Sequence, residues 1–193
     1  MPSQEERART TRAQLLDAFQ SLLLDKGLEA ATTQAVLEQT GLSKGALYHH
    51  YRSKSELMEA VYERESHAAI RRAVAAAAGE ATPLTRLKAS CRAWVSEMRG
   101  GDAGRIVLEL GPSALGTTRV AEIENRLSLP LFEAAIHEAV AAGETSVAHP
   151  KLAAQLINAY MGQVALQTLA DRDLASATIG PVIDAILRAL ETR

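Results

Sequence analysis

The sequence predicts an all-α protein, on the strength of three observations. Apolar residues recur three and four positions apart along most of the chain, and no segment alternates apolar and polar residues as a strand does. Ser or Thr precedes several of these segments and Gly follows them, as at helix ends. With 193 residues, 47% of them hydrophobic, the chain can bury a sizeable core as one domain or two small ones.

The first helix is expected from about residue 9 to residue 26, where Gly27 provides a C-terminal stop. Three basic residues, Arg7, Arg9 and Arg12, lie at its beginning. They are placed to reach a nucleic acid, although Glu5 and Glu6 beside them equally suit an ordinary solvated helix start. The inward-facing residues at helical spacing are Leu15, Leu16, Phe19, Leu22 and Leu23.

Two short helices with a tight turn between them follow. The first is expected over residues 33–40, with Thr32 as its cap, and Gly41 supplies the positive φ of the turn. Ser43 caps the second helix, which starts at Lys44 and turns Leu47 inward. Behind a longer first helix, this arrangement predicts a helix-turn-helix whose second helix is presented for recognition.

The charge of this second helix suggests what it contacts. Residues 39–55 contain no Asp or Glu but include Lys44, Arg52 and Lys54, whereas residues 1–64 together hold eight Lys or Arg and nine Asp or Glu. The positive charge is therefore local, as expected of a docking surface for nucleic acid rather than of a basic tail.

A long helix is expected to link this module to the rest of the chain. Ser53 followed by Glu56 fits the S-x-x-E capping box, and the apolar pattern continues to residue 78, before Gly79. The expected domains are residues 1–52 for DNA binding, residues 53–79 for the linking helix, and residues 80–193 for a helical C-terminal domain.

Five more helices are expected in the C-terminal part. Thr82 and Pro83 begin one that ends at residues 100–101, and Pro130 lies inside another, where it predicts a kink or break over residues 126–129. The remaining expected bounds are residues 103–110, about 119–142 for the helix with Pro130, 150 to about 169, and a last helix from 178 that carries a regular apolar stripe to residue 190.

Over about residues 9–62 the sequence resembles the TetR family of bacterial transcriptional regulators. It departs from the family pattern at Ala35, Leu37, Thr40 and Tyr51, and the Tyr51 hydroxyl needs a partner if it is buried. The residues that carry the resemblance are Thr32, Val36, Gly41, Leu42, Ser43, Lys44, Gly45, Leu47, Tyr48, His49, His50, Ser53 and Lys54.

The resemblance implies specific contacts with a double-stranded DNA operator. Tyr48 could instead belong to the core, and His50 could be a packed or capping histidine. Ala46 can meet a thymine methyl group but cannot hydrogen-bond a base. The implied phosphate contacts come from Thr33, Tyr48, His50 and Lys54, and the implied groove contacts come from Ser43, Lys44, Gly45, Ala46 and His49.

For the C-terminal domain the resemblance implies a ligand pocket and a homodimer interface. The effector is unidentified and is expected to be largely apolar. The expected pocket residues are Trp94, Met98, Phe132, Ile136, Tyr160 and Gln163, with Asn158 or Gln167 as further polar contacts. The expected interface residues are Leu156, Tyr160, Gly162, Val164, Ile179, Val182, Ile183, Ile186, Leu187 and Leu190. Each pocket residue could instead be ordinary core or surface. The two interface stripes could instead pack only within the subunit, because an apolar stripe does not say which partner it faces.

The sequence lacks the motifs that are typical of enzymes and of metal-binding proteins. The sequence has no Gly-rich phosphate loop, no G-x-S-x-G motif and no His or Cys at metal-ligand spacing, so we expect no enzyme, cofactor or metal. The single cysteine, Cys91, and the lack of a signal-like or membrane-spanning segment fit the cytoplasm. The expected function is a repressor released from a near-palindromic operator by a small molecule. A TetR-like activator and a helical protein-interaction module are the alternatives.

Overall fold

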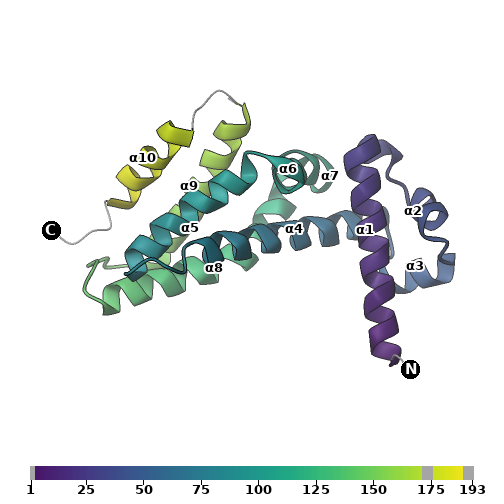
Figure 1. The fold of residues 1–193 in the computed structure, drawn as a ribbon, viewed down its shortest axis with the longest axis horizontal. Coiled ribbons are helices and arrows are strands. Elements are labelled where there is room, and N and C mark those ends of the chain that lie inside the picture. The colour runs from purple at the N-terminus through teal and green to yellow at the C-terminus, as the bar shows by residue number, and fades with distance from the viewer. Residues whose placement is uncertain (1–2, 171–175, 189–193) are drawn as a thin grey trace.

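The computed structural model describes residues 3–170 and 176–188, with side chains over residues 3–167 and 180–188. Throughout these residues the regular structure is helical, as expected. The first three helices pack together at one end of an elongated molecule, and α4 runs from them along its length (Figure 1). Their bounds are Gln4–Ala30 for α1, Thr33–Thr40 for α2, Lys44–His50 for α3 and Lys54–Ala76 for α4.

The remaining helices form the larger part of the molecule, in which α5, α8, α9 and α10 lie beside one another (Figure 1). Within the described residues, no helix is both long and apolar enough to cross a membrane. The bounds are Pro83–Met98 for α5, Gly101–Gly104 for α6, Arg105–Leu110 for the π-helix η1, Gly111–Leu115 for α7, Thr117–Ala141 for α8, Pro150–Ala170 for α9 and Ser176–Leu187 for α10.

Helix α1 begins five residues earlier than the apolar pattern indicated. Ser3 and Glu6 form a capping box: the Ser3 hydroxyl accepts a hydrogen bond from the Glu6 N–H at 3.1 Å, and the Glu6 carboxylate accepts one from the Ser3 N–H at 2.6 Å. At the other end, Gly27 has φ 81° and ψ 175°, which are not helical values. The long straight part of α1 therefore ends where Gly27 was expected to stop it.

Two expectations for the C-terminal part can be compared with the structure. A kink or break was expected over residues 126–129, and α8 continues through Pro130 without a break, although the proline has no N–H to bond with the Arg126 carbonyl. Buried Ile123 and Ile136 anchor the two halves of α8 in the core. The segment expected as an α-helix over residues 103–110 is instead a short α-helix from Gly101 followed by a π-helix over Arg105–Leu110.

The buried residues form two hydrophobic clusters. The first is continuous from Leu15 and Leu47 of the N-terminal helices through Tyr62 of α4 to Ile106 and Ile123. The second fills the space between α5, α8, α9 and α10 and includes Cys91, Ile136, Ile157 and Ile183. The first cluster thus connects α1 and α3 to α8 through continuous packing.

Candidate DNA interface and ligand cavity

The helix-turn-helix forms where the sequence predicted it. Gly41 adopts φ 68° between α2 and α3, a left-handed conformation that glycine adopts without strain. The Thr32 hydroxyl accepts from the Ala35 N–H, and the Ser43 hydroxyl accepts from the Ala46 N–H, each at 3.1 Å. Leu47 is fully buried beneath α3, which fixes the opposite face of the helix toward solvent.

Tyr51, at the end of α3, is buried, and its hydroxyl finds the partner that burial requires. The hydroxyl accepts a hydrogen bond from Nε of Arg12 at 3.0 Å, and the Arg12 guanidinium lies 5.7 Å from the centroid of the Tyr51 ring. Arg12 therefore joins α1 to the end of α3.

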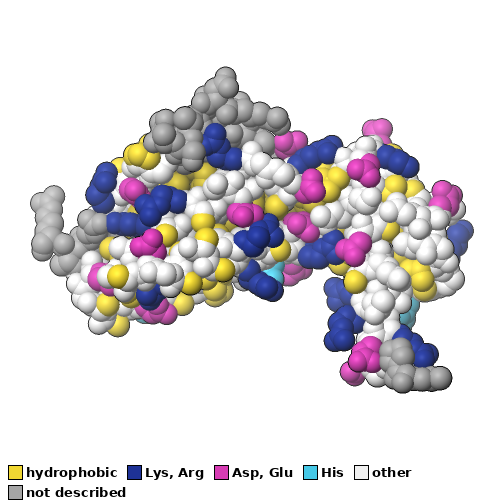
Figure 2. Space-filling view, viewed as in Figure 1, with side chains coloured by type: hydrophobic (Ala, Val, Ile, Leu, Met, Phe, Trp, Pro, Cys, Tyr) yellow, Lys and Arg dark blue, Asp and Glu magenta, His cyan; other side chains and the backbone are white. Residues whose placement is uncertain are grey.

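Most of the residues implied to contact DNA lie on or directly before α3, whereas Thr33 begins α2 and Lys54 begins α4. Tyr48 is 49% exposed, so the alternative that it belongs to the core is wrong. Figure 2 shows Lys, Arg and His side chains on the projecting N-terminal part of the molecule, with acidic groups among them. Ser43, Lys44, Gly45 and His49 are exposed with Tyr48, and Thr33, Ala46, His50 and Lys54 are half-buried.

His50 is available as a neutral hydrogen-bonding group rather than as a cation. Burial, the neighbouring His49 and the Arg12 charge, in that order, lower the pKa of His50 from its ordinary value of 6.5. The His49 and His50 rings meet edge to face with their centroids 5.0 Å apart. The lowered pKa therefore favours the neutral form of His50 on this surface.

Lys54 has a structural contact that the sequence did not reveal. Its ammonium group donates a hydrogen bond to the Leu28 carbonyl at the end of α1, which offsets the unfavourable position of a cation in the first turn of α4. The Ser53 hydroxyl caps the Glu56 N–H at 3.1 Å as expected. The Glu56 carboxylate accepts from the Arg52 N–H at 2.7 Å, one residue before the N–H that a capping box would use.

A cavity of about 700 Å³ lies in the C-terminal part, lined by residues of α4, α5, η1, α7, α8 and α9. This volume is large enough for a drug-sized molecule. Trp94, Phe132 and Gln163 line it, as does Asn158. Cys91 also lines it but is buried, and burial raises the pKa of its thiol to about 12, so the thiol is inert as expected.

Other residues expected in the pocket lie elsewhere. Met98 belongs to the first hydrophobic cluster and Ile136 to the second, and both are almost completely buried. Tyr160 packs against the second cluster, and its hydroxyl has no hydrogen-bond partner among the described residues. Gln167 is not part of the wall either. Met98, Ile136 and Tyr160 share the apolar spacing of the residues that line the cavity, which is why the sequence did not separate them.

One side of the cavity carries a polar network that the sequence did not indicate. The Tyr62 hydroxyl of α4 and the Ser66 hydroxyl each donate a hydrogen bond to Oε1 of Glu124 at 2.7 Å. Burial, and then the charge and hydrogen bond of Glu124, raise the pKa of Tyr62 far above its ordinary value. The phenol therefore remains a donor. Beside it, Ser128 donates to Asn158 at 2.6 Å, and Asn158 donates to Asn125 at 2.7 Å.

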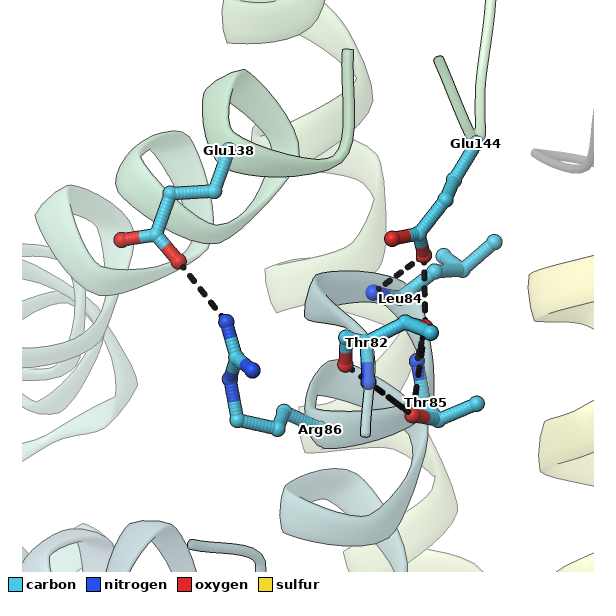
Figure 3. A network of polar contacts seen from close by, with 6 residues as sticks. All are labelled: Thr82, Leu84, Thr85, Arg86, Glu138 and Glu144. Atoms are coloured by element: carbon cyan, nitrogen blue, oxygen red, sulfur yellow. Dashed lines mark hydrogen bonds and ion pairs between the residues drawn. The ribbon is translucent and has the colours of Figure 1, made fainter. Parts of the chain in front are cut away.

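A second set of polar contacts lies at the beginning of α5 (Figure 3). Nη2 of Arg86 lies 3.3 Å from Oε2 of Glu138 on α8, and both residues line the cavity. Glu144 accepts hydrogen bonds from the Thr82 hydroxyl at 2.7 Å and from the Leu84 N–H at 2.9 Å. A carboxylate at a helix N-terminus is favourable, so Glu144 fastens the segment after α8 to α5.

The expected dimer residues divide between the surface and the core. Leu156, Val182 and Ile186 are 62%, 47% and 40% exposed, respectively, and form apolar surface on α9 and α10. Ile183 and Leu187, by contrast, are completely buried in the second cluster, because α10 turns them toward the core of its own protomer. Tyr160 and Val164 pack against that cluster, and Gly162 is exposed. Ile179 and Leu190 lie outside the residues whose side chains the structure describes.

The fold and these sites define a helix-turn-helix protein whose long fourth helix leads to a helical part with its own cavity. Residues 6–61 match the model of bacterial regulatory proteins of the tetR family, and residues 84–192 match the tetracyclin repressor-like C-terminal domain. This chain belongs to the TetR family.

Individual proteins are similar over different lengths. The HTH-type transcriptional regulator UidR of Escherichia coli K12 is 29% identical over 72 residues, which cover 37% of this chain and 37% of UidR. A TetR-family regulator from Pectobacterium atrosepticum has 22% identity and a TM-score of 0.84, with 100% of this chain and 99% of that chain covered. RolR in complex with resorcinol has 15% identity and a TM-score of 0.73, covering 97% and 90%. The two structures support the fold alone.

Proposed function

We propose that this protein is a ligand-responsive, sequence-specific DNA-binding transcriptional regulator that acts as a homodimeric repressor in the cytoplasm. The observation that carries the proposal is the outward face of α3, on which Lys44, Tyr48 and His49 are exposed in a stretch without carboxylates. Lysine can neutralise phosphates, and the small residues Gly45 and Ala46 allow the helix backbone to approach base edges.

A homodimer would give these contacts their specificity. One short helix covers only a few base pairs, whereas two copies related by a two-fold axis read a near-palindrome with half-sites roughly 34–36 Å apart. The exposed apolar residues Leu156, Val182 and Ile186 support an interface built from α9 and α10. The distance between the two α3 helices would then depend on the shape of each protomer.

The cavity offers a means of release. Its walls include α4 and α8, and α8 shares a hydrophobic cluster with α1 and α3. A small molecule that binds better to a conformation with the wrong spacing of the two α3 helices lowers DNA affinity by its difference in binding free energy.

The proposal is tested by titrating the purified full-length chain against its own upstream DNA at several salt concentrations. We expect a preference for one near-palindromic site and a linear fall of log affinity with log salt concentration. Binding with no sequence preference, or with no loss at higher salt, would overturn it. Transcription from that promoter with and without the protein separates a repressor, which lowers transcript, from an activator, which raises it.

A further inference from the structure

The charges that line the cavity do not balance, and this imbalance indicates a class of ligand. Three charged side chains among the described residues line it: Arg86, Glu124 and Glu138. Arg86 and Glu138 pair with each other, with Nη2 and Oε2 3.3 Å apart. Glu124 therefore contributes a negative charge that no cation of the described cavity wall offsets.

The arginines on the same helix as Glu124 have other partners. Arg119 is paired with Glu59 of α4 and with Glu122, and Arg126 is paired with Glu63 at 2.8 Å. Because these arginines pair with other carboxylates, the side-chain donors to Glu124 among the described residues are the hydroxyls of Tyr62 and Ser66.

The two oxygens of Glu124 differ in what they contact. Oε1 accepts the hydrogen bonds of Tyr62 and Ser66, both at 2.7 Å, and these fix the orientation of the carboxylate. No described residue donates a hydrogen bond to Oε2. An oriented carboxylate with one oxygen available is a site for a donor, and a cationic donor gains the most from it.

The rest of the wall suits an apolar, aromatic body. Trp94 and Phe132 line the cavity with aliphatic side chains that include Val74 and Leu131. Aromatic faces also attract a cation through their quadrupole. An anionic ligand would instead bring a second negative charge toward Glu124 and pay for its own desolvation.

Resting on the proposed function, we propose that the effector is an apolar, aromatic molecule with a single protonated amine, which Oε2 of Glu124 binds as a charge-assisted hydrogen-bond acceptor. Glu124 is then the residue that determines ligand charge, while Tyr62 and Ser66 position it.

The test uses three probes with one framework and different charges at neutral pH: 4,4-diphenylbutylamine, 4,4-diphenylbutan-1-ol and 4,4-diphenylbutanoate. Trp94 is the single tryptophan of the chain and lines the cavity, so its emission reports binding there. We expect the amine to bind about tenfold or more tightly than the alcohol, and the carboxylate to bind most weakly. Thermal stabilisation by each probe provides a second readout.

Glu124→Gln removes the charge but keeps an oxygen that can accept from Tyr62 and Ser66. We expect this variant to lose the preference for the amine, with the affinity for the alcohol changed by less than about threefold. Glu122→Gln is the matched control: Glu122 lies on the same helix, pairs with Arg119 and does not line the cavity. It should leave the order of the three probes unchanged.

The outcomes separate the two proposals. Equal binding of all three probes by the unaltered protein, or a preference for the carboxylate, overturns the assignment of ligand charge while the cavity stands as a ligand site. An amine preference that survives Glu124→Gln overturns the role of Glu124. If no probe changes Trp94 emission or thermal stability, this inference fails, while the proposed function is tested separately by the DNA titration.

Discussion

The Tyr62 hydroxyl donates a hydrogen bond to Glu124 at 2.7 Å and thereby joins α4 to α8 at the wall of the cavity. Tyr62 is completely buried, and its ring belongs to the cluster that includes Leu15 and Leu47 of the N-terminal helices. A molecule that changes the position of Glu124 is therefore expected to shift Tyr62 and with it α4, which begins beside α3.

Tyr62→Phe removes this hydrogen bond and leaves Ser66 as the donor to Oε1. We expect a loss of about 1–2 kcal/mol in the free energy of unfolding, because the acceptor is a carboxylate of which Ser66 continues to satisfy part. Urea denaturation at a fixed protein concentration measures it. Ser66→Ala and the double variant complete a mutant cycle, and strict additivity of the two losses would show that the hydroxyls do not act through one oxygen.

The same tyrosine gives the protein a dependence on alkaline pH. Burial and Glu124 raise the pKa of Tyr62 in the folded state, whereas in the unfolded chain it is about 10. Its contribution to stability is therefore complete below about pH 10 and decreases as the pH rises further, since only the unfolded chain then releases the proton. Absorbance at 295 nm should show Tyr62 ionising only with unfolding. Loss of that step in Tyr62→Phe identifies the residue.

Gly111, the first residue of α7, permits the contact between that segment and Tyr62. A Cβ added at Gly111 would lie 2.2 Å from Cδ2 of Tyr62 and 2.9 Å from the Ile106 carbonyl oxygen. We expect Gly111→Ala to destabilise the protein by at least about 2 kcal/mol, measured by thermal unfolding, because a fully buried ring cannot move aside.

Gly162 of α9 is the matched control for Gly111. A Cβ added there meets nothing within 4 Å in the protomer, so Gly162→Ala should stabilise the helix by about 0.5–1 kcal/mol. Equal effects of the two alanine substitutions would contradict the close contact at Gly111. A loss of dimer with Gly162→Ala alone would show that α9 approaches its partner closely at this residue.

The local signals of the sequence were sufficient for the helix-turn-helix. Thr32, Gly41 and Ser43 act through hydrogen bonds and φ values that involve only residues up to four positions away, so their positions predict the bounds of α2 and α3. The start of α1 is also set by a local signal, the capping box of Ser3 and Glu6. The apolar pattern begins after this box, so the pattern alone placed the start of the helix too late.

The cavity depends on contacts between distant residues, which a helical pattern does not contain. Trp94 and Met98 lie on one apolar stripe of α5, yet Trp94 lines the cavity and Met98 enters the first cluster. Glu124 meets Tyr62 only because α8 packs against α4, 62 residues away along the chain. The π-helix η1 also depends on a contact that a helical pattern does not contain. It follows Gly104, and a Cβ added at Gly104 would lie 2.1 Å from the Met98 carbonyl oxygen.

Lys44 and Lys54 should respond differently to alanine substitution. Lys44 is exposed on α3 and is implied to contact the groove, so Lys44→Ala should change sequence preference and leave thermal stability unchanged. Lys54 is implied to contact a phosphate, so Lys54→Ala should weaken DNA binding for all sequences alike and reduce the slope of log affinity against log salt by about one. Lys54→Ala also removes the donor to the Leu28 carbonyl, so it should cost about 1 kcal/mol of stability in addition. If the two variants lose DNA affinity and no stability, the Lys54 contact has no structural role.

The exposed apolar residues of α9 and α10 make the expected dimer testable without DNA. A glutamate at Leu156 or Ile186 would bury a charge between two protomers, and we expect sedimentation to show mostly monomer for either variant. Operator affinity should fall as the dimer is lost, because a single α3 reads only one half-site.

Val140→Glu is the control for this dimer experiment. Val140 is an apolar residue of α8 that is 37% exposed and lies outside the expected interface. Val140→Glu should leave the dimer intact, because Val140 lies outside the expected interface. Monomers from Val140→Glu, or unchanged dimers from both Leu156→Glu and Ile186→Glu, would require an interface on another face. Ile183→Glu would not answer the question, because Ile183 is buried within its own protomer and the charge would unfold α10 from α5.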